Sequence, residues 1–117
     1  MAIHEGSCHC GQVAYSVEAD FTEAIQCNCS HCSRKGFLLA FVPPEKVTLK
    51  TPESAYRTYF FNKHKIEHRF CPSCGTEPFA LGELPNGAKM MAINLRCVPD
   101  VDLAKIEIKQ YDGANKL

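Results

Sequence analysis

The sequence predicts a mainly β protein, and three observations support this prediction. Apolar and polar residues alternate over short runs, as at residues 13–18, which is typical of half-buried strands. Turn-forming residues such as Pro43 and Pro44 separate the runs. Helical patterns are scarce. The 117 residues, 45% of them apolar, suffice for one domain with one core, which we expect to span residues 1–117.

The expected elements follow one another along most of the chain. The predicted strands are, in order, 13–18, 37–42, 47–49, 55–61, 66–70, 79–81, 89–95 and 106–110. The aromatic strand 55–61 and the strand 66–70 form a hairpin through a turn at 62–65, and a second turn is predicted at 84–87. Short helices are expected at 30–35, with Ser30 as the cap, and at 100–104.

Seven of the eight cysteines fall into three tight clusters. These are a CxC, a CxCxxC and a CxxC, formed by Cys8 and Cys10, by Cys27, Cys29 and Cys32, and by Cys71 and Cys74. Cysteines at these spacings can turn their sulfurs toward one ion, as zinc with about four ligands requires. Two pairs and one triplet suggest a closed four-sulfur site and a three-sulfur site with an open position. Such an open position is typical of catalytic rather than structural zinc.

Composition favours metal over disulfides and excludes several other classes. Residues 1–10 contain no apolar run of signal-peptide length, and a CxC disulfide would close a small, strained ring. We therefore expect a cytoplasmic, reduced protein. No segment approaches the roughly 20 apolar residues of a membrane span. The 13 basic and 13 acidic residues cancel, so we expect neither nucleic acid nor an anionic membrane as partner.

Four motifs carry a resemblance to a known family. They are GSCHCG at 6–11, CNCSHC at 27–32, FCPSCGT at 70–76 and NLRC at 94–97. In this order and spacing they resemble the glutathione-dependent formaldehyde-activating enzyme family, which includes centromere-protein-V-like domains. The resemblance extends from about Ile3 to about Tyr111.

The resemblance implies a fold, two metal ions and a reaction. The fold is two small antiparallel sheets around a zinc-ribbon-like centre, similar to methionine-R-sulfoxide reductase B. The family pattern places a structural zinc on Cys8, Cys10, Cys71 and Cys74, and a second zinc, the candidate catalytic one, on Cys27, Cys29 and Cys32. The family's reaction condenses formaldehyde with glutathione to S-hydroxymethylglutathione, which is a carbon–sulfur lyase reaction in reverse.

The triplet has chemistry that agrees with a thiol substrate. Three thiolates on Zn²⁺ leave a net charge of about −1, which suits a fourth thiolate better than activation of water. An incoming thiol would lose its proton on coordination and be presented to a carbonyl carbon. Arg34 and Lys35 directly follow the triplet and are candidates for binding the carboxylates of a glutathione-like thiol. The simpler interpretation of these two residues is a solvated helix end.

The remaining histidines and Cys97 receive weaker assignments. His31 lies inside the triplet and could close its site as a fourth ligand, although the CxxC turn is expected to point it elsewhere. His9 should point away from the first metal, and His64 and His68 are expected at the surface. Cys97 is expected to be a small buried hydrophobe, with a position near the second zinc as the alternative.

Alternative functions remain open at this point. Both zinc ions could stabilise a non-catalytic module that binds a thiol or a protein partner. A redox pair of Cys71 and Cys74 is disfavoured because no βαβ pattern surrounds it. A nucleic-acid-binding zinc ribbon is disfavoured by the neutral net charge.

Overall fold

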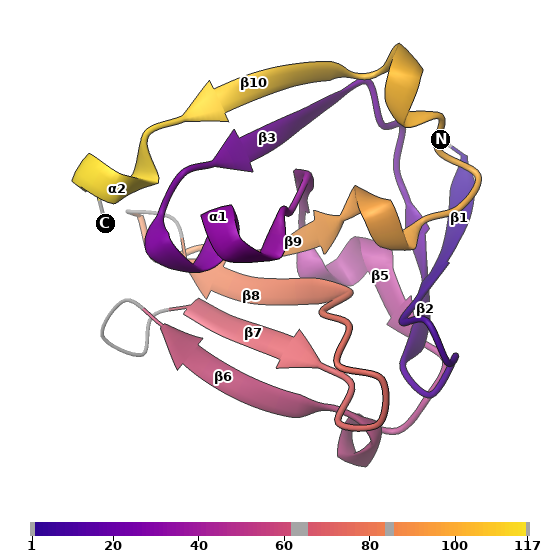
Figure 1. The fold of residues 1–117 in the computed structure, drawn as a ribbon. Coiled ribbons are helices and arrows are strands. Elements are labelled where there is room, and N and C mark those ends of the chain that lie inside the picture. The colour runs from indigo at the N-terminus through magenta and orange to yellow at the C-terminus, as the bar shows by residue number, and fades with distance from the viewer. Residues whose placement is uncertain (1, 62–65, 84–85, 117) are drawn as a thin grey trace.

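The computed structural model describes residues 2–61, 66–83 and 86–116, and most of its elements are strands (Figure 1). A three-stranded antiparallel sheet has the order β1-β2-β5, with bounds Ile3–Ser7, Ala14–Glu18 and Val47–Leu49. A second sheet has the order β10-β3-β4-β9-β8-β7-β6. Its strands are β3 (Glu23–Cys27), β4 (Leu39–Val42), β6 (Arg57–Phe61), β7 (Ile66–Phe70), β8 (Phe79–Glu83), β9 (Lys89–Asn94) and β10 (Glu107–Tyr111).

The prediction of a mainly β protein with two sheets is confirmed, but one detail of it is wrong. The larger sheet has seven strands in the described residues, and its pair β10 and β3 is parallel, with Glu107 opposite Glu23. Figure 1 shows why: the yellow β10 returns along the outer edge of β3 in the same direction. The sequence could not indicate this pairing, because direction depends on where the intervening chain crosses the molecule.

Most predicted strands are present, and two observed strands were not predicted. The strands β5 and β7 have the predicted bounds, whereas β1 and β3 were missed. Both missed strands mix polar with apolar residues, and β1 contains one glycine in its five residues, so neither shows clear alternation. The predicted turn at 62–65 and the first half of that at 84–87 lie outside the described residues.

The short helices differ from the prediction mainly at their ends. Helix α1 (Ser30–Lys35) has the predicted bounds, but the expected cap Ser30 is wrong. Cys29 is the N-cap, because its sulfur accepts a hydrogen bond from the Cys32 N–H. Gly36 ends the helix with a φ of 71°, a left-handed conformation that glycine adopts without strain. The segment predicted helical at 100–104 forms a 3₁₀ turn, η4 (Leu103–Lys105).

Four further short elements, together with η4, complete the described part of the chain. They are the 3₁₀ turns η1 (Pro44–Lys46), η2 (Glu53–Ala55) and η3 (Leu95–Cys97) and helix α2 (Gly113–Lys116). No helix in the described residues is long and apolar enough to cross a membrane.

Two buried clusters of side chains position the cysteines. The first packs β2 against β8 and β9, with the Tyr15 ring edge-on to Phe79 at 5.6 Å between centroids, and includes Cys8 and Cys71. The second places helix α1 against the larger sheet and includes the whole triplet. The triplet therefore lies wholly within one hydrophobic cluster, whereas the four-thiol group lies at the edge of the other, with Cys10 exposed.

Candidate metal centres

The first and third cysteine clusters meet at one point. The sulfurs of Cys8, Cys10, Cys71 and Cys74 all lie within 4.8 Å of one another. The Cys8–Cys10 and Cys10–Cys71 sulfur separations are 3.7 and 3.6 Å. Tetrahedral zinc with Zn–S bonds of about 2.3 Å places sulfurs about 3.8 Å apart. Four thiols at these separations fit a closed, four-sulfur metal centre.

Tight turns present these four sulfurs. Gly75 has a φ of 80°, and its N–H donates to the Cys71 carbonyl at 2.8 Å. Gly11 has a φ of 83° and donates to the Cys8 carbonyl in the same way. Backbone N–H groups also point at the sulfurs, including Val13 N–H to Cys8 Sγ at 3.3 Å. These donors stabilise thiolates, which are the metal-binding form of cysteine.

The electrostatics of the CxxC turn agree with this conclusion. The Thr76 hydroxyl and backbone N–H lower the pKa of Cys74 to about 5. Burial raises the pKa of Cys71, but hydrogen bonds from the Cys74 and Ser73 N–H groups outweigh it and the net shift is downward. Both thiols therefore deprotonate readily.

The triplet forms a second, buried group. Cys27 ends β3, Cys29 caps α1 and Cys32 lies in its first turn, and the three sulfurs lie within 4.8 Å of one another. Cys29 N–H donates to Cys27 Sγ at 3.4 Å and Cys32 N–H donates to Cys29 Sγ at 3.3 Å. Within the described residues this group has three members. Three thiols fit a soft ion such as zinc and leave one coordination position for another ligand.

Burial and hydrogen bonding have opposing effects on the pKa values of the triplet. Burial raises the pKa of Cys27 and of Cys32. Burial also acts on Cys29, but there the backbone and side-chain hydrogen bonds from Cys32 outweigh it, so the pKa is lowered. Cys29 is therefore the sulfur that deprotonates first.

Three basic side chains lie on or beside α1, with the Arg34 guanidinium directed back to its first residue. Arg34 Nη1 donates to the Ser30 carbonyl at 2.8 Å, and Lys35 Nζ lies 3.3 Å from Glu77 Oε1 with 41% of its side chain exposed. Arg96 Nε donates to the Gly36 carbonyl at 2.8 Å, which brings this distant residue to the same place. The anion-binding role of Arg34 and Lys35 stays a prediction.

Sequence reasoning missed a cluster of two histidines and one glutamate. The ligand atoms of His31, His68 and Glu77 lie within 4.8 Å of one another. The expectation of a surface position for His68 is wrong, because it is 3% exposed. Strand alternation turns its ring toward Phe37, with ring centroids 5.8 Å apart. Glu77 stands in no recognisable motif, so only folding reveals that it is buried beside the histidines.

Burial gives His68 an unusual protonation behaviour. Its pKa is lowered to about 4 by burial and by the neighbouring His31 and Lys35, while Glu77 acts in the opposite direction. His68 is consequently neutral at pH 7, the form in which imidazole binds metals.

The remaining candidate residues from the sequence lie in different surroundings. His9 is exposed, and His64 lies outside the described residues. His31 Nε2 lies 3.1 Å from Glu77 Oε2, so its ring is directed away from the triplet, as expected, and toward Glu77, which was not predicted. Cys97 is buried as expected, and burial together with the Cys8 and Cys74 thiols raises its pKa to about 11. Its electrostatic neighbours thus belong to the four-thiol centre.

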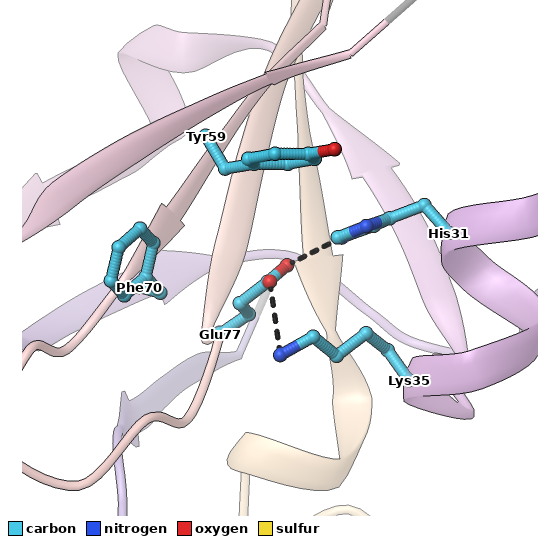
Figure 2. Close-up of a pocket in the computed structure, with 5 residues that line it drawn as sticks. All are labelled: His31, Lys35, Tyr59, Phe70 and Glu77. Carbon is cyan, nitrogen blue, oxygen red and sulfur yellow. Dashed lines mark hydrogen bonds and ion pairs between the residues drawn. The ribbon is translucent and has the colours of Figure 1, made fainter.

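A pocket adjoins the missed cluster. It has a volume of about 260 Å³ and is lined by His31, Lys35, Tyr59, Phe70 and Glu77. Figure 2 shows His31 and Lys35 extending from helix α1 to the two oxygens of Glu77, with the Tyr59 ring on one side and Phe70 opposite the helix. The pocket therefore combines a carboxylate, an ammonium and an imidazole with two aromatic walls.

Comparison with known proteins agrees with the fold and the cysteine pattern. A crystal structure of a Rhodobacter sphaeroides protein has the same fold, with a TM-score of 0.78 and 24% identity, and the match covers 92% of this chain and 99% of that chain. The sequence signature described as "Glutathione-dependent formaldehyde-activating enzyme" matches residues 3–112. With nearly its whole length matched, the chain belongs to the glutathione-dependent formaldehyde-activating enzyme family.

Proposed function

We propose that this protein is a zinc-dependent carbon–sulfur lyase that handles thiol adducts such as S-hydroxymethylglutathione, formed from glutathione and formaldehyde. The observation that carries the proposal is the buried group of three thiols, Cys27, Cys29 and Cys32, in a chain of this family. A cytoplasmic location, a single domain over residues 1–117 and an architecture similar to methionine-R-sulfoxide reductase B belong to the same proposal.

The two cysteine groups have different proposed roles. Cys8, Cys10, Cys71 and Cys74 would hold a structural zinc, because four thiols leave no position for substrate. Cys27, Cys29 and Cys32 would hold the second ion. A zinc ion on three thiolates supplies a soft centre of low acidity that favours a further thiolate over water.

The chain's own residues would orient the substrate. Glutathione carries two carboxylates, and Arg34, Lys35 and Arg96 provide cationic donors on and beside the helix that carries the triplet. In the reaction the thiolate sulfur forms a bond to the aldehyde carbon. The carbonyl π pair moves to the aldehyde oxygen, which takes a proton from water.

The first test counts zinc per chain by elemental analysis after purification under strict reduction. We expect Cys32→Ser to retain one ion fewer than the wild type. Cys97→Ala is the matched control, because Cys97 is a buried cysteine outside both groups, and it should retain the wild-type zinc content. Equal zinc in all three proteins would contradict metal binding by the triplet.

The second test addresses turnover. Because glutathione and formaldehyde also combine spontaneously, exchange NMR at equilibrium is the suitable assay. We expect acceleration of the exchange by the wild type and by Cys97→Ala, and loss of the acceleration in Cys32→Ser. If millimolar glutathione does not change the spectrum of the cobalt-substituted protein, thiol ligation is wrong. If glutathione changes that spectrum without accelerating exchange, the protein is a non-catalytic thiol-binding module.

A further inference from the structure

The cluster of His31, His68 and Glu77 joins three segments of the chain. His31 belongs to helix α1, His68 to strand β7, and Glu77 to the segment between the CxxC turn and β8. His31 Nε2 and His68 Nδ1 lie 3.1 and 3.5 Å from the same carboxylate oxygen, Glu77 Oε2. The two imidazole centroids are 4.1 Å apart. Three donor atoms therefore converge in one small space.

We propose that His31, His68 and Glu77 form a third metal site, which binds a divalent transition-metal ion such as Zn²⁺ through two imidazole nitrogens and one carboxylate oxygen. The separations support this assignment. Bonds of about 2.0–2.1 Å in a tetrahedral site place neighbouring ligand atoms about 3.3–3.4 Å apart. The two nitrogen–oxygen separations, 3.1 and 3.5 Å, lie on either side of that value.

An independent observation points to a missing ligand at this place. The His68 side chain is only 4% exposed, and both of its ring nitrogens are buried without a hydrogen-bond partner among the described residues. Buried polar groups in folded proteins are almost always satisfied by protein, water or an ion. An ion bound to Nδ1 would give the His68 ring a partner that the described part of the chain does not supply.

The surroundings suit a metal ion with one coordination position accessible from outside. Phe37 and Phe61 form apolar walls, with their ring centroids 5.8 and 6.3 Å from that of His68. The pocket beside Tyr59 and Phe70 leaves room for an external ligand next to Glu77 and His31 (Figure 2). Two histidines, one glutamate and an open position form a donor set typical of zinc and other first-row metal sites in enzymes.

Lys35 affects how tightly the site binds a metal ion and which external ligand that ion accepts. Its ammonium lies 3.3 Å from Glu77 Oε1, the carboxylate oxygen that the histidines do not contact. This contact orients the carboxylate, as outer groups commonly do around metals. The same positive charge weakens cation binding and favours an anionic external ligand. We therefore expect this site to bind metal less tightly than the thiol groups do.

This site is separate from the thiol chemistry of the family. Its donors are nitrogen and oxygen rather than sulfur, whereas Phe37 and Phe61 pack against both this cluster and the triplet. Helix α1 nevertheless connects the two, because His31 lies between Cys29 and Cys32. The proposal does not depend on glutathione or on turnover.

Cobalt spectroscopy distinguishes the two kinds of donor. The full chain is first loaded with zinc so that the thiol groups are filled, and Co²⁺ is then titrated. We expect one further ion per chain with visible d–d absorption and without the intense thiolate-to-cobalt charge-transfer bands. Glu77→Gln, which keeps the side-chain shape, should weaken this binding at least tenfold. Glu67→Gln is the matched control on β7 and should bind as the wild type does.

Two results would overturn the proposal. One is a wild-type titration in which all bound cobalt shows thiolate charge transfer. The other is equal affinity in Glu77→Gln and Glu67→Gln. A second readout does not depend on any variant: on addition of Zn²⁺ to the zinc-loaded chain, the imidazole ¹⁵N signals of His31 and His68 should shift in NMR spectra, whereas His4, which pairs with Asp100, should not. Unchanged His31 and His68 signals would likewise contradict the site.

Discussion

Replacing Gly6 with alanine should destabilise the protein by forcing a buried ring to move. Gly6 pairs with Tyr15 across the β1–β2 ladder. A Cβ at Gly6 would lie 2.7 Å from Tyr15 Cε2 and closer still to Cζ and the hydroxyl oxygen. Ordinary contacts between carbon atoms lie at about 3.5–4.0 Å. The ring would therefore have to move by roughly 1 Å.

The surroundings of Tyr15 allow little movement. Its side chain is 0% exposed, and its ring edge packs on Phe79. Overpacking of a buried site costs about 1–3 kcal/mol, and the enclosed ring places this case near the upper end. Alanine also lowers the conformational entropy of the unfolded chain, which stabilises the folded protein by about 0.4–1 kcal/mol. The free energy of unfolding should therefore fall by about 2 kcal/mol, which lowers Tm by roughly 6–12 °C for a chain of this size.

The assay is thermal unfolding by circular dichroism under reduction and at equal free zinc, because bound metal raises apparent stability. Gly82→Ala is the matched control, since Gly82 also lies in a strand and nothing lies within 4 Å of its added Cβ. The control should leave Tm unchanged or raise it slightly. A Gly6→Ala protein within about 0.5 kcal/mol of the wild type would refute the reasoning.

Three further predictions concern the metal centres and their turns. Gly36→Ala should cost about 1 kcal/mol, because its φ of 71° suits glycine, and denaturant unfolding measures it. Thr76→Val removes the largest influence that lowers the pKa of Cys74 to about 5, so the pH midpoint of Cys74 alkylation in the metal-free protein should rise; an unchanged midpoint would contradict this. A strong chelator under reduction should unfold the chain cooperatively, and unaltered circular dichroism would exclude a structural metal.

Local patterns allowed much of the fold to be predicted. Alternation was sufficient for β5 and β7, and a capping residue near position 30 for α1, because each of these depends on neighbours within a few positions. The N-terminal cap of α1 was less predictable. Serine is the common cap, but here the Cys29 sulfur takes that role, since the same sulfur belongs to the triplet.

The cysteine groups were the most predictable part of the site. Closely spaced thiols within one turn can meet without knowledge of the whole fold, and the resemblance joined the first pair to the CxxC. The sulfurs of Cys8 and Cys71, 63 positions apart in sequence, do lie in one group. The order of the four motifs was enough to indicate the family. The family match over residues 3–112 confirms that prediction.

By itself the sequence determined the β class, the cysteine groups and the family. Each of these can be recognised from the spacing of apolar residues or of cysteines within short segments. Only the tertiary structure decided which distant polar side chains meet. His68 and Glu77 lie on either side of the motif at 70–76 and belong to no motif themselves, and His31 comes from another segment. The parallel pairing of β10 with β3 and the approach of Arg96 to the end of α1 are of the same kind. Such contacts depend on the path of the whole chain, and no local spacing encodes that path.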